Sequence, residues 1–236
     1  MMKALLSRRG VEFDEFNVVA DPSAMDELVS RGIMSVPAAI VGDQSMSGWN
    51  PGRLAELLGM DLEEKPVAPA ELVRTVRLVL DAAIRAAGQV PEDKWEMTYA
   101  HRPRPLRELV RHLFHVVEAS VDADVLGIFP AERWLKQVDV PYLTGRSRLL
   151  RYGETVRAKF DSWYSHIDED AFARTIDADV GPRTLNQVLE RTRLHAGQHL
   201  RQVYAFLEMA GVQPDDPLTE AEMRRIGFTQ LPDEVF

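Results

Sequence analysis

The spacing of apolar positions along the chain changes character near residue 62. Before that point, short segments alternate between the helical spacing and the extended pattern typical of strands. We predict helices at 1–9, 21–30 and 52–58, and β-prone runs at 11–19, 38–41 and 44–48. Gly42-Asp43 is a turn signal that joins the last two runs into a hairpin. Residues 1–62 therefore predict a small α/β unit.

Beyond this unit the pattern is helical throughout. Two prolines and several charged residues in 63–69 indicate a linker. Four long segments with apolar stripes follow, at about 69–87, 104–126, 146–166 and 184–210. Prolines fall between these segments, where helices are expected to stop. The sequence predicts an all-α four-helix bundle at 70–212 and a tail, 213–236, with a short helix at 219–225. The overall fold class is α+β.

Composition sets limits on function. The 236 residues are 45% hydrophobic and 28% charged, and the formal charge is −9. This acidic balance argues against a nucleic-acid or anionic-membrane partner. No apolar run reaches the length of a membrane span, and the N-terminus lacks the apolar core of a signal peptide. We expect a cytoplasmic protein.

The chain contains no cysteine. This excludes disulfides, thiolate metal ligands and catalysis by a cysteine of this chain. Metal chemistry, where present, must use histidine or carboxylate ligands.

The informative histidines are His195 and His199. A spacing of four on a helix places both imidazoles on one face, one turn apart. The face is the apolar one that should meet the rest of the bundle, and a buried imidazole needs a polar partner. We favour a metal ion as that partner, with a carboxylate or carbonyl group as the alternative.

A third ligand is expected from the segment 104–126. On a helical wheel, His112 lies at the edge of the apolar stripe and can face the bundle interior. His115 points to the opposite side and is the weaker candidate, expected to face water. His101 is interpreted as a loop residue, and His166 as a surface residue at a helix C-terminus.

Three neutral imidazoles without a thiolate leave at least one coordination position open for water or a substrate. Zinc, nickel or iron would suit these ligands. A carboxylate-rich di-iron site is not expected, because Glu-x-x-His motifs are missing. Four further side chains of the last bundle helix could contact an anionic substrate: Arg193, Gln198, Arg201 and Gln202. For the two arginines, a solvated helix face is the favoured interpretation.

Two segments together resemble a known family. Residues 106–119 contain His112 after Arg-Glu-Leu-Val-Arg, and 195–211 contain His-x-x-x-His-x-x-Gln with a downstream glycine. Over roughly 66–212 the chain resembles the DinB-like (YfiT-like) family. The resemblance implies a four-helix bundle with a three-histidine divalent-metal site, often in a homodimer. It also implies, for several members, a thiol-dependent transferase or isomerase activity that uses a low-molecular-weight thiol.

The N-terminal segment resembles a different family. Residues 3–59 resemble the latter part of a glutaredoxin-like, thioredoxin-fold domain. The segments that carry this resemblance are Lys3–Phe13, the run Gly32-Ile-Met-Ser-Val-Pro-Ala, Gly48-Trp49 and Leu54–Leu58. In that family the Val-Pro pair marks a cis-proline loop that faces the active site. The resemblance therefore implies a cis Pro37 and a weak cofactor-binding role for it.

The chain departs from the glutaredoxin pattern at its start. The first strand and the Cys-x-x-Cys or Cys-x-x-Ser motif of that family are not found here. Three explanations remain open: a true start further upstream, decay of the domain to a docking module, or a strand supplied by another copy of the chain. In each case this sequence itself performs no dithiol chemistry.

Two functional hypotheses follow. In the first, His112, His195 and His199 bind a divalent metal that activates a low-molecular-weight thiol for S-transfer, isomerisation or hydrolysis of a small-molecule substrate. In the second, the metal only stabilises the bundle, and the N-terminal module mediates binding or assembly. A third interpretation is a metal-free bundle in which the three histidines satisfy one another and nearby carboxylates. No catalytic residue is identifiable from the sequence.

Overall fold

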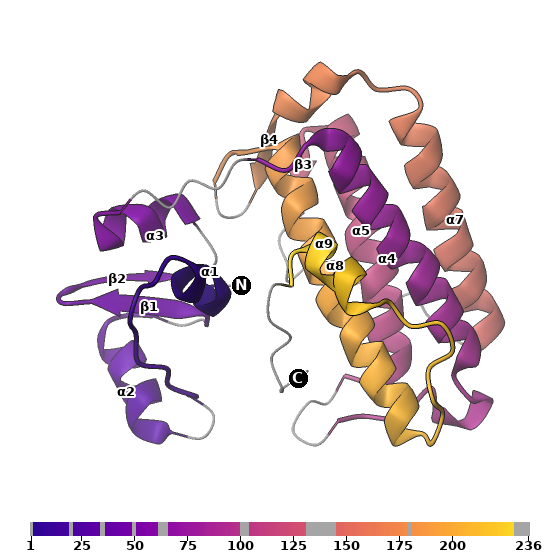
Figure 1. Ribbon diagram of the computed structural model, residues 1–236, viewed down its shortest axis with the longest axis horizontal. Helices are drawn as coiled ribbons and strands as arrows, with labels where there is room; N and C mark the ends of the chain where they lie inside the picture. Colours follow the sequence, from indigo (N-terminus) through magenta and orange to yellow (C-terminus); the bar gives the residue numbers. More distant parts are fainter. Residues whose placement is uncertain are drawn as a thin grey trace. The chain divides into compact units, whose positions relative to one another are not determined.

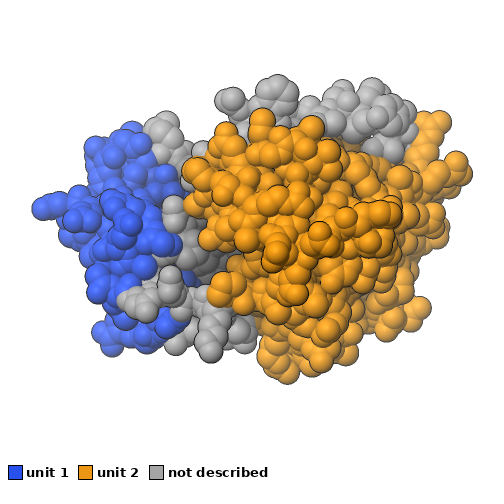
Figure 2. Space-filling view, turned by 90° about the horizontal axis from the view of Figure 1, so that it is seen from above, with its two compact units in different colours: residues 1–65 blue, residues 66–236 orange. Residues whose placement is uncertain are grey.

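The structure is a computed structural model of the chain, and it forms two compact units. It describes residues 2–18, 21–33, 36–48, 51–60, 66–99, 104–130, 145–178 and 181–228. The units are Met1–Lys65 and Pro66–Phe236, drawn in blue and orange in Figure 2. The boundary between them lies inside the range 63–69 that the sequence indicates as a linker.

The described residues of the first unit form three helices and a hairpin, which can be followed in Figure 1. Its elements are α1 (Met2–Arg8), α2 (Pro22–Ser30), β1 (Ala38–Val41), β2 (Gln44–Ser47) and α3 (Pro51–Leu58). The strands pair antiparallel, with Ala38 opposite Ser47 and Val41 opposite Gln44. Asp21 caps α2, because its carboxylate accepts hydrogen bonds from the first backbone N–H groups. A small apolar core joins α1, β2 and α3 through Met2, Leu5, Leu6, Met46, Leu54 and Leu57.

Most of these elements agree with the sequence prediction, and one does not. The Val36–Pro37 peptide bond is cis, as the resemblance implied. The predicted strand at 11–19 is wrong for residues 11–18, which form no strand. The apolar positions there alternate only until Phe13, and the next one, Phe16, follows after two polar residues. Phe16 is 65% exposed, so the run presents no single face that could be buried.

In its described residues, the second unit is built on four long helices that pack against one another, as can be followed in Figure 1. Its long helices are α4 (Pro69–Gln89), α5 (Leu106–Leu126), α7 (Arg146–Tyr164) and α8 (Leu185–Met209). Helices α4 and α5 each pack against both α7 and α8. The apolar stripes of all four helices meet in one large core that includes Leu80, Leu113, Phe160 and Leu200. The sequence predicted these helices because each stripe persists over many turns.

The bundle unit also contains short elements that the sequence did not predict. They are the 3-10 turns η1 (Glu92–Lys94) and η2 (Glu169–Ala173), and the strands β3 (Ile128–Phe129), β4 (Thr175–Ala178) and β5 (Arg183–Thr184). Strand β4 pairs parallel with β3 and antiparallel with β5. The unit is predominantly helical, as the sequence predicted, and the small sheet is an addition to it. The small sheet ties the end of α5 to the start of α8, where Thr184 and Gln187 form a capping box.

The C-terminal segment docks on α8. Helix α9 (Glu220–Ile226) agrees with the short helix predicted at 219–225, and it begins at a capping box formed by Thr219 and Glu222. It approaches α8 closely at Gly197, where an added Cβ would lie 2.8 Å from the Ile226 side chain.

This docking buries the two arginines that the sequence analysis placed on a solvated face. Arg193 donates a hydrogen bond to the Arg225 carbonyl oxygen, at 2.9 Å. The Arg201 guanidinium lies 5.6 Å from the Phe228 ring centre. Both side chains hold the C-terminal segment, so the solvated interpretation was wrong for them. Over the described residues, no helix has the length and hydropathy needed to cross a membrane.

Candidate metal centre

Two adjacent helices bring three histidines together. His112 comes from α5, and His195 and His199 come from α8, which packs directly against α5. His112 is almost completely buried, with 1% of its surface exposed. His195 and His199 are partly buried, so the group has an interior side and a more accessible side. Helix packing and the four-residue spacing on α8 are sufficient to explain this arrangement.

The three side chains converge through the same ring nitrogen. The Nε2 atom of His195 lies 3.1 Å from Nε2 of His112 and 3.0 Å from Nε2 of His199. In a tetrahedral site with bonds of about 2.0–2.1 Å, two ligand nitrogens are separated by about 3.3 Å. The observed separations are close to that value. The donor set therefore fits a divalent ion with only small side-chain adjustments.

Gln202 fixes the orientation of one imidazole. The Nδ1–H group of His199 donates to Oε1 of Gln202 at 2.7 Å. With the proton on Nδ1, the lone pair of His199 resides on Nε2, which faces the other histidines. Gln202 is buried, with 5% of its surface exposed. Such outer hydrogen bonds orient metal-binding imidazoles and increase their basicity.

The role of Gln202 differs from the one that the sequence suggested. The sequence suggested a contact to the substrate, whereas in the structure the side-chain oxygen of Gln202 accepts a hydrogen bond from His199. The signal was present as the three-residue spacing from His199 to Gln202, which brings the two side chains together on a helix.

The electrostatics keep the central imidazole neutral. Burial lowers the pKa of His195 to about 2, and the neighbouring His199 and His112 act in the same direction. Arg191 and Arg104 contribute further positive potential. A neutral imidazole offers its lone pair to a cation without first losing a proton. Three such ligands would leave at least one coordination position for a substrate atom.

His115 lies outside this group, three residues after His112 on α5. Its Nδ1 atom is 3.3 Å from the Tyr152 hydroxyl and 3.5 Å from the Glu118 carboxylate. Its side chain is only 22% exposed. The expectation that His115 faces water was wrong, because α7 covers it with Tyr152.

The Glu118 cluster is a satisfied polar network. Tyr152 donates to Glu118 at 2.6 Å, and Lys159 lies 3.3 Å from the same carboxylate. The hydrogen bond with His115, followed by those of Tyr152 and Lys159, lowers the pKa of Glu118 to about 2 despite burial. Burial and the adjacent Glu118 raise the pKa of Tyr152 far above its ordinary range. This network joins α5 to α7.

Of the remaining two histidines, only His166 lies among the described residues, and it does not join the group. His166 is exposed just after the end of α7, where its Nδ1 atom lies 2.6 Å from the Ser162 carbonyl oxygen, in agreement with its interpretation as a surface residue. His101 lies outside the described residues.

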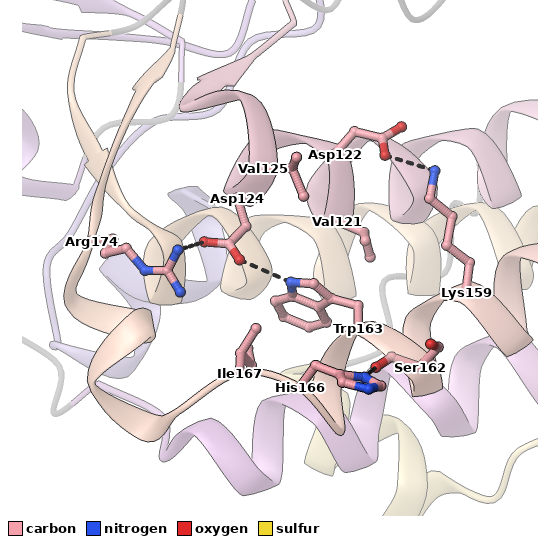
Figure 3. Close-up of a pocket in the computed structure, with 10 residues that line it drawn as sticks. All are labelled: Val121, Asp122, Asp124, Val125, Lys159, Ser162, Trp163, His166, Ile167 and Arg174. Atoms are coloured by element: carbon pink, nitrogen blue, oxygen red, sulfur yellow. Dashed lines mark hydrogen bonds and ion pairs between the residues drawn. The ribbon is translucent and has the colours of Figure 1, made fainter.

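A pocket of about 620 Å³ lies elsewhere, between the ends of α5 and α7 (Figure 3). Its lining includes Trp163, whose Nε1–H donates to Asp124 at 3.0 Å. Arg174 pairs with Asp124, and Lys159 pairs with Asp122, as the dashed lines in Figure 3 mark. None of the three converging histidines lines this pocket. Its acidic groups are already matched by basic ones.

Comparison with known proteins decides the family. Residues 72–203, which span α4 to most of α8, match the sequence profile of the DinB superfamily. The chain belongs to the DinB superfamily. Proteins of this superfamily are generally metal-binding, and the matched region contains His112, His195 and His199.

The N-terminal unit is glutaredoxin-like, because residues 1–46 match the glutaredoxin family profile. Two similar proteins are both named glutaredoxin-like protein NrdH. The one from Lactococcus lactis subsp. lactis (strain IL1403) is 32% identical over 57 residues, which are 24% of this chain and 79% of the relative. The one from Salmonella typhimurium (strain LT2) is 36% identical over 55 residues, which are 23% of this chain and 68% of the relative.

Proposed function

We propose that this DinB superfamily protein binds a divalent metal ion, zinc, nickel or iron, through His112, His195 and His199. We propose further that it is an enzyme that uses this ion to act on a low-molecular-weight thiol, in an S-transfer, isomerisation or hydrolysis reaction. The observation that carries the proposal is the convergence of three Nε2 atoms at separations of 3.0 and 3.1 Å.

The hydrogen bond between His199 and Gln202 supports a bound metal rather than a network in which the three histidines bond only to one another. His199 donates from Nδ1 to Gln202, so its Nε2 atom has no proton to share with His195. Two ring nitrogens at about 3 Å repel each other unless a proton or a cation lies between them. A single cation would satisfy all three lone pairs at once.

The proposal of a thiol substrate is supported by two observations on the sequence. The N-terminal unit belongs to a fold that ordinarily handles thiols, and the chain itself has no cysteine. Since these residues offer no thiol, we place the reacting sulfur on a small molecule. When bound, the metal would lower the pKa of such a thiol and hold the thiolate as a nucleophile. The chain's own contribution is to orient the ligands through Gln202 and to exclude water on the His112 side.

The alternative is a stabilising metal in a non-catalytic binding or assembly protein. Nearly complete burial of His112 favours this alternative, as does the separation of the described pocket from the histidines. A metal that binds only the folded bundle would add directly to its stability. The partial exposure of His195 and His199 favours the enzyme, since a substrate atom needs access to the ion.

Cobalt spectroscopy separates the two functions. The full chain is loaded with Co²⁺, and glutathione, cysteine and 2-mercaptoethanol are each titrated into it. An enzyme with an open position should develop a sulfur-to-cobalt charge-transfer band in the near ultraviolet. The band should be lost in His195→Ala and retained in His166→Ala, which removes an exposed histidine outside the group. Bound cobalt whose spectrum does not respond to any thiol would refute the enzyme and favour the stabilising metal.

A further inference from the structure

The stripe of α8 that carries the two histidines begins with an arginine. Arg191, His195 and His199 follow one another at intervals of four residues, so they lie along one face of the helix. Arg191 is partly buried, as are the two histidines. A cation is thus placed one turn before the candidate metal ligands, on the same side of the helix.

The position of the Arg191 guanidinium is defined by an aromatic ring. Its Cζ atom lies 5.6 Å from the centre of the Phe129 ring. Phe129 is buried and belongs to β3, where it pairs with Ala178 of β4. At this distance the cation lies over the ring, as in a cation–π contact. A guanidinium also carries N–H donors in a planar fork, a geometry that suits a carboxylate or phosphate.

The charged groups described near the three histidines are positive. The group of candidate ligands among the described residues contains three histidines and no carboxylate. A divalent ion held by three neutral imidazoles keeps its full double charge. Arg191 and Arg104, which precedes α5 by two residues, add positive potential at His195. A partly buried centre with this excess of positive charge favours an anionic ligand.

We propose that Arg191, assisted by Arg104, forms an anion-binding subsite beside the three-histidine centre, and that the substrate carries a carboxylate or phosphate besides the group that meets the metal. The inference rests on the proposed function, and it narrows the substrate class to anionic thiols or anionic acceptors. The sulfur would approach the metal, and the remote anion would bind the Arg191 fork.

The first test uses Co²⁺-loaded full chain and two thiols. Mercaptosuccinate carries two carboxylates, whereas 2-mercaptoethanol is neutral. We expect the wild type to bind mercaptosuccinate at least about tenfold more tightly, since hydrogen bonds to charged groups are the stronger class. Arg191→Gln should reduce this ratio about tenfold, with metal content and 2-mercaptoethanol affinity unchanged. Arg151→Gln, an exposed arginine of α7, serves as the matched control and should leave the ratio intact.

Arg191→Lys distinguishes charge from packing. Lysine keeps the positive charge without the planar guanidinium that lies over Phe129, so Arg191→Lys should retain part of the ratio if the charge binds the anion. Equal loss in the Gln and Lys variants, together with a lower unfolding temperature in both, would assign Arg191 to packing and overturn the proposal. An unchanged ratio in Arg191→Gln would overturn it as well.

An experiment on the metal-free protein tests the anion subsite independently of the proposed metal-dependent function. Succinate, compared with sodium chloride at equal ionic strength, should raise the unfolding temperature of the metal-free wild type and of Arg191→Lys, and should not raise that of Arg191→Gln. A succinate effect without metal binding would support the anion subsite while the metalloenzyme fails. Metal and thiol binding with no preference for anions, and no succinate effect, would reject the subsite while leaving the metalloenzyme in place.

Discussion

Replacing Gln202 by leucine tests how the histidines are held. The substitution removes the acceptor that lies 2.7 Å from Nδ1 of His199 and fills nearly the same buried volume. Loss of a hydrogen bond of this kind weakens metal binding about 10- to 100-fold, or about 1.4–2.8 kcal/mol. We therefore expect the metal dissociation constant of Gln202→Leu to rise within that range, because the imidazole can then rotate or adopt the other tautomer.

The assay is competition with a chromophoric chelator at fixed pH, run on purified full chain. Gln202→Glu keeps an acceptor and should bind metal at least as tightly as the wild type. Gln198→Leu is the matched control, because Gln198 lies on the same helix and accepts a hydrogen bond from Arg201. Wild-type affinity in Gln202→Leu would refute the inference that this amide orients His199. Equal losses in Gln198→Leu and Gln202→Leu would refute it too.

Three further predictions concern the bundle. Gly153→Ala should destabilise the bundle by about 1–2 kcal/mol in urea unfolding, because the new Cβ would lie 2.6 Å from the buried Phe114 ring. Gly88→Ala, whose new Cβ has no atom within 4 Å, should instead stabilise it by up to about 1 kcal/mol. Glu118 contributes stability above pH about 4.5 that is lost as the pH falls toward 2, so Glu118→Gln should flatten the acid limb of stability against pH by about 2 kcal/mol; an unchanged limb would contradict this. Thr184→Ala should cost about 1 kcal/mol by removing the α8 cap, and a cost near zero in urea unfolding would contradict that role.

The sequence was sufficient for the long elements of the fold because their signals are local and repeated. Helices such as α4 and α8 carry an apolar stripe over many turns, and prolines separate them from their neighbours. The same periodicity singled out His195 and His199 on the inner face, and preferred His112 over His115. The structure brings those three side chains together.

The features that the sequence did not provide depend on partners that are distant in the chain. Strands β3 and β5 have two residues each, too few for a periodic pattern. The burial of Arg193 depends on the docking of α9, and charged residues by themselves indicate a solvated face. His115 is half-buried because Tyr152 of α7 covers it.

The metal content of the purified protein is the most direct test of the central claim. Wild type, His195→Ala and His166→Ala would be expressed side by side and analysed by inductively coupled plasma mass spectrometry, before and after reconstitution with zinc, nickel and iron. We expect near-stoichiometric metal in the wild type and in His166→Ala, and a loss of most of it in the folded His195→Ala variant. A wild type that holds no metal after reconstitution, or a His195→Ala variant that retains it, would contradict the three-histidine centre.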